Sequence, residues 1–330
     1  MSTTPAVNTS VTFITIDAES KGQRLDNYLF RELKTLPKTR IYNLLRRGEI
    51  RVNKGRKRAD YKLCEHDVIR LPPNAQLATP APIANAQQQQ EFDRKFEPWI
   101  IHEDDRLLVI NKPPGLAVHG GSGLHYGLIE LIRRHRPYAK NWELVHRLDR
   151  DTSGLIMIAK KRSELRRLHQ VFRDNRLEKI YWAVLHGELS KDVYHVRAAL
   201  KKNQLAGGAR VVRVDSQGQP SETIFTVCGR GDGLTWVQAK PITGRTHQIR
   251  VHAQSIGHWI IGDDRYGQSD VNQNLRKGEK VGLMLHARQL KVPVCNADQQ
   301  EHMASWIAPP PAGMSALIRR WISESARFSD

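Results

Sequence analysis

The chain has little cysteine and no long hydrophobic run. Its 330 residues include three cysteines, Cys64, Cys228 and Cys295, which are widely spaced and odd in number. We therefore expect no disulfide framework, but buried thiols in a reducing cytoplasm. Apolar runs such as 107–110 and 155–159 have the length of a strand and are too short to span a bilayer. Because the polar first ten residues show no secretory signal, a soluble cytoplasmic protein without membrane association is expected.

The sequence also lacks the spacing of a metal site. It contains no Cys-x-x-Cys pair. His247 and His252 are five residues apart, about 140° around a helix, whereas a zinc helix carries histidines four residues apart. No bound metal is therefore expected.

Acidic residues are scarce relative to basic ones. The chain has 52 Lys and Arg against 34 Asp and Glu, a net charge of +18. Residues 21–73 hold 15 Lys and Arg against six Asp and Glu, so half of the excess charge lies in about a sixth of the chain. Such a charge favours a polyanionic partner, above all nucleic acid, although some proteins are basic without binding nucleic acid.

The basic segment combines two helical patterns with a short strand. A first helix is expected to bury Leu25, Tyr28, Leu29 and Leu33. A second is expected to begin near Pro37, to bury Ile41, Leu44 and Leu45, and to end at Gly48. Residues 50–53 alternate as a strand. The polar side chains that this arrangement turns outward form a candidate phosphate-binding surface, namely Arg40, Asn43, Arg46, Arg47 and Arg51.

This segment resembles the S4 RNA-binding domain over about 50 residues. The matching pieces are Arg24-Leu25-Asp26, the helix from Arg40 to Gly48, residues 50–53 and Asp67-Val68-Ile69. It departs from the family at Lys54 and His66, where glycine is usual, which places the geometry of two turns in question.

Composition divides the rest of the chain. We expect a tail and lead-in strand over 1–20, the S4-like domain over 21–73 and a catalytic domain over 98–330. Residues 74–97 are rich in Ala, Pro and Gln and should form a flexible linker, because they have too little apolar surface to bury.

The most informative stretch runs from His146 to Gly154, directly before the apolar run 155–159. Charged and small residues at a strand start are typical of a loop that holds a site. A kinase catalytic loop is disfavoured, because no metal-binding Asn follows the aspartate and no Gly-rich phosphate loop precedes it. A hydrolase is disfavoured as well, because Ser153 does not lie in a nucleophile elbow. Asp149 and Asp151 could suggest a glycosidase pair, but they are two residues apart. From these residues alone, a turn stabilised by Asp and Ser caps is an equally good interpretation.

This loop resembles the active-site motif of the pseudouridine synthases of the ribosomal large-subunit type. Further segments that resemble the family follow in its order, namely 107–113, 179–181, 244–252, 262–267 and 285–287. His119-Gly120-Gly121-Ser122-Gly123 resembles a subgroup that acts on several uridines of 23S ribosomal RNA. The resemblance implies an α+β fold, with a mixed, mostly antiparallel β-sheet and flanking helices. It also implies an isomerisation that needs no cofactor.

The resemblance assigns roles to individual residues. It implies that Asp149 is the nucleophile. A carboxylate suits this role because it can form a covalent intermediate. Arg250 pairs with it, and Tyr181 stacks on the target base. A uridine in folded RNA must first be turned out of its stack, and Arg147 fills the space that it leaves. Further substrate or RNA contacts are assigned to His146, Lys179, Arg245 and His247.

Spacing predicts how Arg250 is presented. Thr246 is expected to cap a helix that buries Ile249, Ala253 and Ile256 and ends at Gly257. Arg250 would then lie at the edge of the buried stripe, about 100° from Ile249, from where it can reach a neighbouring loop.

Two other interpretations keep the basic segment but change the function. A non-catalytic RNA-binding or ribosome-assembly factor would not need Asp149, Tyr181 and Arg250 together, and a base-excising glycosylase would release free uracil. The expected partner is 23S ribosomal RNA or a large-subunit assembly intermediate. A monomer without an obligate protein partner is expected.

Overall fold

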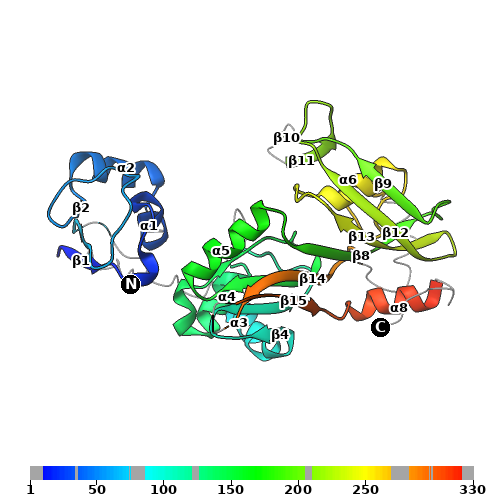
Figure 1. Cartoon of the computed structure of the whole chain (residues 1–330), viewed down its shortest axis with the longest axis horizontal. Coiled ribbons are helices and arrows are strands. Elements are labelled where there is room, and N and C mark those ends of the chain that lie inside the picture. Colours follow the sequence, from blue (N-terminus) through cyan, green and yellow to red (C-terminus); the bar gives the residue numbers. More distant parts are fainter. Residues whose placement is uncertain are drawn as a thin grey trace, which may run out of the picture. The chain divides into compact units, whose positions relative to one another are not determined.

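The structure, a computed structural model, describes residues 10–33, 36–73, 75, 86–120, 126–204, 210–268, 282–296, 298 and 300–321. The chain forms two compact units, Met1–Ala86 and Gln87–Asp330 (Figure 1). Within the described ranges, no helix is long and apolar enough to cross a membrane. All three cysteines are free thiols, but only Cys228 is buried, whereas Cys64 is exposed and Cys295 half-buried. The expectation of three buried thiols is therefore wrong.

The first unit packs two helices on a three-stranded antiparallel sheet of order β1-β3-β2. Its elements are β1 (Thr12–Thr15), η1 (Ala18–Ser20), α1 (Leu25–Glu32), α2 (Lys38–Arg47), β2 (Arg51–Val52) and β3 (Val68–Leu71). The apolar residues expected on the inner faces of the two helices are all buried, which confirms both helical patterns. Gly48 ends α2 at a left-handed φ of 69°, as predicted.

Two turns of this unit use non-glycine residues in left-handed conformations. Lys54 has φ 65° and His66 has φ 67°, a region that favours glycine. Asn53, at φ 50°, already leaves the extended conformation, so the strand expected over 50–53 is shortened to Arg51–Val52. Both positions at which glycine was expected thus adopt a conformation that glycine favours.

The linker expected over 74–97 is wrong in its second half. Ala86–Lys95 forms α3, followed by η2 (Glu97–Trp99). Phe92 and Phe96 are one helical turn apart, stack at 4.8 Å between ring centroids, and are buried in the core of the second unit. Burying two aromatic rings outweighs the polar composition around them. Most of the remaining linker, residues 74 and 76–85, lies outside the described residues.

The second unit is built on a ten-stranded, mostly antiparallel sheet flanked by helices, as expected. The path of neighbouring strands is β4-β5-β7-β14-β8-β13-β12-β9, with β15 beside β14 and β6 beside β7. A separate hairpin joins β10 and β11. The strands are β4 (Ile100–Glu103), β5 (Leu107–Lys112), β6 (Glu143–Leu144), β7 (Ser153–Ala159), β8 (Glu178–His186), β9 (Val193–Arg197), β10 (Leu200–Gln204), β11 (Arg210–Val214), β12 (Glu222–Gly231), β13 (Leu234–Pro241), β14 (Leu285–Cys295) and β15 (Glu301–Ile307). The helices after α3 and η2 are α4 (Leu128–His135), η3 (Pro137–Asn141), α5 (Arg162–Arg173), α6 (Gln248–Ser255) and α8 (Ala312–Trp321).

Strand β7 is buried along its whole length and apolar from Leu155 to Ala159, because both of its faces are covered. Ile156 and Ile158 pack into the cluster that includes α3 and α4, whereas Leu155 and Met157 pack into the one that includes α5. Alternate side chains of a strand point to opposite faces, so a continuous apolar run is required here. The loop that precedes β7 therefore starts from a rigid base.

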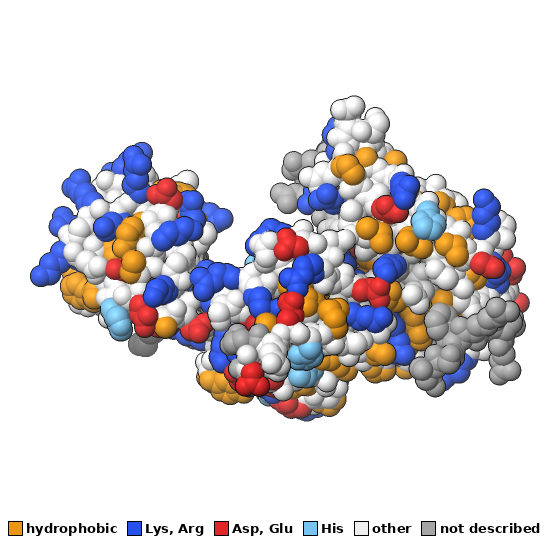
Figure 2. Space-filling view, in the orientation of Figure 1, with side chains coloured by type: hydrophobic (Ala, Val, Ile, Leu, Met, Phe, Trp, Pro, Cys, Tyr) orange, Lys and Arg blue, Asp and Glu red, His pale blue; other side chains and the backbone are white. Residues whose placement is uncertain are grey.

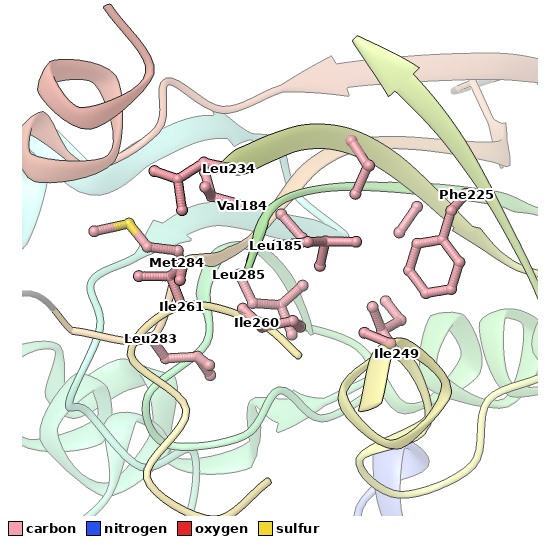
Figure 3. Packing of buried hydrophobic residues seen from close by; sticks show 14 of the residues in the cluster. Val184, Leu185, Phe225, Leu234, Ile249, Ile260, Ile261, Leu283, Met284 and Leu285 are labelled. Atoms are coloured by element: carbon pink, nitrogen blue, oxygen red, sulfur yellow. The ribbon is translucent and has the colours of Figure 1, made fainter. Parts of the chain in front are cut away.

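Helix α6 is held by a third cluster, on β8, β12, β13 and β14. Ile249 packs with Phe225, Leu185 and Leu285 (Figure 3). Every residue from Gln248 to Ala253 is buried. Since the first six residues of the helix are buried on every side and not along one stripe, Arg250 lies inside the protein and not at a surface edge.

Candidate active site

The loop before β7 is fixed by a buried lysine. Thr152 N–H donates to the Asp149 carbonyl at 3.2 Å, which closes a turn. Lys112, at the end of β5 and fully buried, donates from Nζ to the carbonyls of Pro113, Leu116 and Arg150, each at 2.9 Å. Burial lowers the pKa of Lys112 to about 7, against the opposing effect of the Asp151 and Asp149 carboxylates. One side chain thus ties the loop to the end of β5.

Arg250 joins Asp149 to a second carboxylate, that of Asp263. Its Nη1 donates to Asp149 Oδ2 at 3.0 Å, while Nε and Nη2 donate to the two oxygens of Asp263 at 2.7 and 2.8 Å. Burial alone would lower the pKa of Arg250, but Asp263 and then Asp149 raise it well above its usual value. Asp263 is 1% exposed, whereas the Asp149 side chain keeps 28% of its surface exposed. The fixed guanidinium therefore leaves an accessible carboxylate in a defined orientation.

The start of α6 differs from the prediction. His247, not Thr246, occupies the N-cap, in a left-handed conformation with φ 54° and without a side-chain cap. The side chain of Gln248 makes a hydrogen bond at the start of the helix instead: its Oε1 accepts from the Arg245 N–H at 3.0 Å. This conformation places His247 between Tyr266, whose hydroxyl lies 2.6 Å from Nδ1, and Asp149, whose Oδ2 lies 3.6 Å from Nε2.

A cleft of about 460 Å³, here called the Asp149 cleft, lies beside this carboxylate. Its lining includes Asp149, Tyr181, Lys179 and His247. Burial and, to a smaller extent, the Asp149 carboxylate raise the pKa of Tyr181, so its phenol stays neutral. The cleft thus combines an aromatic ring with a carboxylate.

His146 lines the same cleft, but its Nε2 is occupied. This atom accepts from the Met157 N–H at 3.1 Å, and the ring stacks on Phe172 at 5.4 Å between centroids. Burial and the nearby Lys179 lower the pKa of His146 to about 3. His146 is therefore neutral at pH 7 and anchors the loop to β7.

Arg147 stands where two clefts meet. It is exposed and lines both the Asp149 cleft and a wider cleft of about 1510 Å³, which Asp149 also lines. Within the described part of the chain, its guanidinium has no hydrogen bond or ion pair. Asp151 instead faces Arg150, at 3.1 Å, and lines only the wider cleft of the two. The two aspartates thus have different partners, and only Asp149 lines the Asp149 cleft.

The remaining basic residues lie at the surface. Arg245 is exposed at the cleft, with Nε donating to the Pro220 carbonyl at 3.3 Å. In the first unit, Arg40, Arg46, Arg47 and Arg51 are all exposed. Lys and Arg side chains cover much of the face of this unit shown in Figure 2.

Sequence reasoning missed Asp263 and Lys112. Asp263 lies in the segment 262–267, but nothing in that segment distinguishes it from Asp264 as the partner of Arg250. The role of Lys112 could have been predicted from the sequence, because this lysine ends the apolar run of β5. A buried lysine there needs carbonyl or carboxylate partners.

Comparison with known proteins agrees with the motifs. The RNA pseudouridylate synthase family matches residues 106–255. Ribosomal large subunit pseudouridine synthase C of Haemophilus ducreyi is 46% identical over 291 residues, 88% of this chain and 90% of that protein. The protein of that name in Yersinia pestis is 48% identical over 286 residues, covering 86% and 88%. These names agree with the subgroup expected from 119–123, of which residues 121–123 lie outside the described residues.

Solved structures agree as well. Human RNA pseudouridylate synthase domain containing 1 is 27% identical with a TM-score of 0.57, over 70% of this chain and 90% of that chain. Human RNA pseudouridylate synthase domain containing 4 is 25% identical with a TM-score of 0.56, over 71% and 96%. The motifs, the fold and the length of the match lead to one conclusion: the chain belongs to the family of ribosomal large subunit pseudouridine synthases.

Proposed function

We propose that this protein converts specific uridines of 23S ribosomal RNA to pseudouridine, with Asp149 as the nucleophile. The observation that carries the proposal is the accessible carboxylate of Asp149, held at 3.0 Å by Arg250 beside a cleft lined by Tyr181. In the reaction the N1–C1′ bond breaks, the base turns, and C5 bonds C1′. A nucleophilic carboxylate divides this exchange into two easier steps.

The neighbouring residues fit the roles of base binding and base extrusion. We assign Tyr181 to stacking on the flipped uracil, since its ring stays uncharged in the cleft. We assign Arg147 to the gap that the uridine leaves, because it is exposed beside Asp149 and has no other partner among the described residues. His247 and Lys179 line the space for the base, Arg245 lies at its mouth, and His146 orients the loop.

The N-terminal unit is proposed to act as an S4-type RNA-binding domain. Its outward arginines and its net charge suit phosphate contacts, which supply affinity without reading sequence. The chain is proposed to work as a monomer in the cytoplasm. The names of its relatives refer to the large ribosomal subunit, which is the basis for choosing 23S RNA.

The proposal is tested on an unmodified 23S RNA transcript. We expect the purified protein to form pseudouridine at defined positions without added metal or cofactor. Asp149→Asn should keep RNA binding within about twofold but lose turnover, because the amide preserves shape and cannot act as a carboxylate nucleophile. Asp151→Asn, in the same loop, is the matched control and should stay active.

Three outcomes would contradict the proposal. Release of free uracil would indicate a glycosylase, and binding without any modification would indicate an assembly factor. Turnover by Asp149→Asn would move the nucleophile elsewhere in the loop.

A further inference from the structure

Lys179 is half-buried, and within the described part of the chain its amine has no hydrogen bond or ion pair. Its side chain lines the Asp149 cleft, and Nζ lies 3.8 Å from the position that a Cβ on Gly244 would take. Burial lowers the pKa of Lys179, and no carboxylate opposes this effect. Because an unpaired charge is costly to bury, such an amine points to a ligand that enters the cleft.

The position of Lys179 on β8 places it beside the stacking tyrosine. Lys179 and Tyr181 are two residues apart on one strand, so their side chains share a face and start about 7 Å apart. A lysine side chain covers that distance. The amine can therefore reach the edge of a ring stacked on Tyr181.

The other cationic side chains of the cleft either have carboxylate partners or are exposed to solvent. Arg250 already binds both Asp149 and Asp263, and Arg147 is exposed at the mouth. The remaining lining combines polar residues, such as Thr243 and Gln248, with the apolar Val145, Phe172, Pro241 and Leu285. Beside the apolar part, a charge interaction is stronger than in water.

We propose that Lys179 is a catalytic residue that stabilises the negative charge on the uracil base after the base detaches from the ribose. The inference rests on the proposed function. Asp149 bonds C1′ as the N1–C1′ bond breaks, and the electron pair of that bond stays on the base, which becomes an anion with charge on O2 and O4. C5 then bonds C1′ while Asp149 leaves with its own electron pair. Water takes the proton from C5 and supplies one to N1, which restores the aromatic ring. The Lys179 ammonium donates to a carbonyl oxygen of the anion.

The test compares single-turnover rates and RNA affinity in the full-length protein. Removing one preorganised donor typically costs about 10²–10³ in rate, so Lys179→Met should slow the reaction about 100-fold at saturating protein. The dissociation constant should stay within about twofold, and Lys179→Arg should recover part of the rate. Lys140→Met removes the same charge from an exposed position outside the cleft and should behave as the wild type.

A substrate variant tests the charge directly. A 5-fluorouracil anion is less basic than a uracil anion and needs less stabilisation. The rate penalty of Lys179→Met should therefore be several-fold smaller when the target nucleotide is 5-fluorouridine, measured as its consumption. Thermal unfolding is measured first, and Lys179→Gln replaces Lys179→Met if the latter does not fold.

Each alternative result has a definite meaning. An equal penalty on both nucleotides, or a normal rate in Lys179→Met, overturns the role of Lys179 while the proposed function stands. Weaker binding at an unchanged rate also overturns it and makes Lys179 a phosphate contact. A wild-type protein that forms no pseudouridine refutes the proposed function itself.

Discussion

Two carboxylates depend on Arg250, and they differ in how far water can reach them. Asp263 is almost fully buried, whereas Asp149 is not. We predict that Arg250→Ala loses both activity and about 3–5 kcal/mol of the free energy of unfolding, since it leaves a buried charge unpaired. Chemical denaturation and a turnover assay measure the two effects. Replacing Asp263 by Asn in the same variant should restore stability but not activity.

The pH dependence of Arg250→Ala follows from Asp263. In the wild type, Arg250 lowers the pKa of Asp263 against the effect of burial. The resulting contribution to stability is present above the pKa of Asp263 in the unfolded state. It is lost as the pH falls through the lower pKa of the folded state. Without Arg250, burial raises the pKa, and a protonated Asp263 can stay buried. The stability difference between variant and wild type should therefore shrink toward acid pH. A stability difference that does not change with pH would show that the loss of stability does not come from the unpaired Asp263.

The role of Arg147 can be tested by comparing folded and unstructured RNA substrates. If it fills the gap left by the flipped uridine, it matters most when the base must be unstacked, which costs a few kcal/mol and least for a single-stranded base. Arg147→Ala should therefore slow turnover far more on a folded ribosomal fragment than on a short unstructured RNA with the same uridine. Arg150→Ala, in the same loop, should affect both substrates equally. Equal losses for Arg147→Ala would assign it to phosphate binding.

Helix α3 is a structural part of the second unit, although its composition suggests a linker. Phe92 is 3% exposed and contacts both Phe96 and Trp99. Phe92→Ala should lower the free energy of unfolding by about 3–5 kcal/mol, through lost burial and the cavity left behind. Gln90→Ala, an exposed position on the same helix, should change it by less than about 0.5 kcal/mol. A neutral Phe92→Ala would mean that α3 is not part of the core.

At the scale of the whole molecule, the two units should divide the work between RNA affinity and chemistry. We predict that removing residues 1–85, which leaves α3 intact, weakens RNA binding and flattens its salt dependence while the second unit stays folded. Each lost phosphate contact lowers the log–log salt slope by about 0.7–0.9. In the full chain, Arg40→Gln, Arg46→Gln and Arg47→Gln together should reproduce part of this change. An unchanged slope in both proteins would show that the first unit does not touch the RNA.

The sequence by itself determined the parts of this protein that depend on neighbouring residues. Helices α1 and α2 follow from apolar residues at helical spacing, and the left-handed Gly48 follows from the need to end a helix. The family motifs identified Asp149 and Arg250 as a pair, because a motif fixes residue types at short spacing. These features need no knowledge of distant segments.

Only the tertiary structure decided which distant groups meet. Asp149 and Arg250 are 101 residues apart, and the loop of Asp149 is braced by Lys112 across 38 residues. The choice of Asp263 over Asp264, the burial of α3, and His247 at the N-cap in place of Thr246 all depend on packing against other elements. Local periodicity does not constrain such contacts, since the same pattern is compatible with many partners until the cores around β7 and α6 have closed.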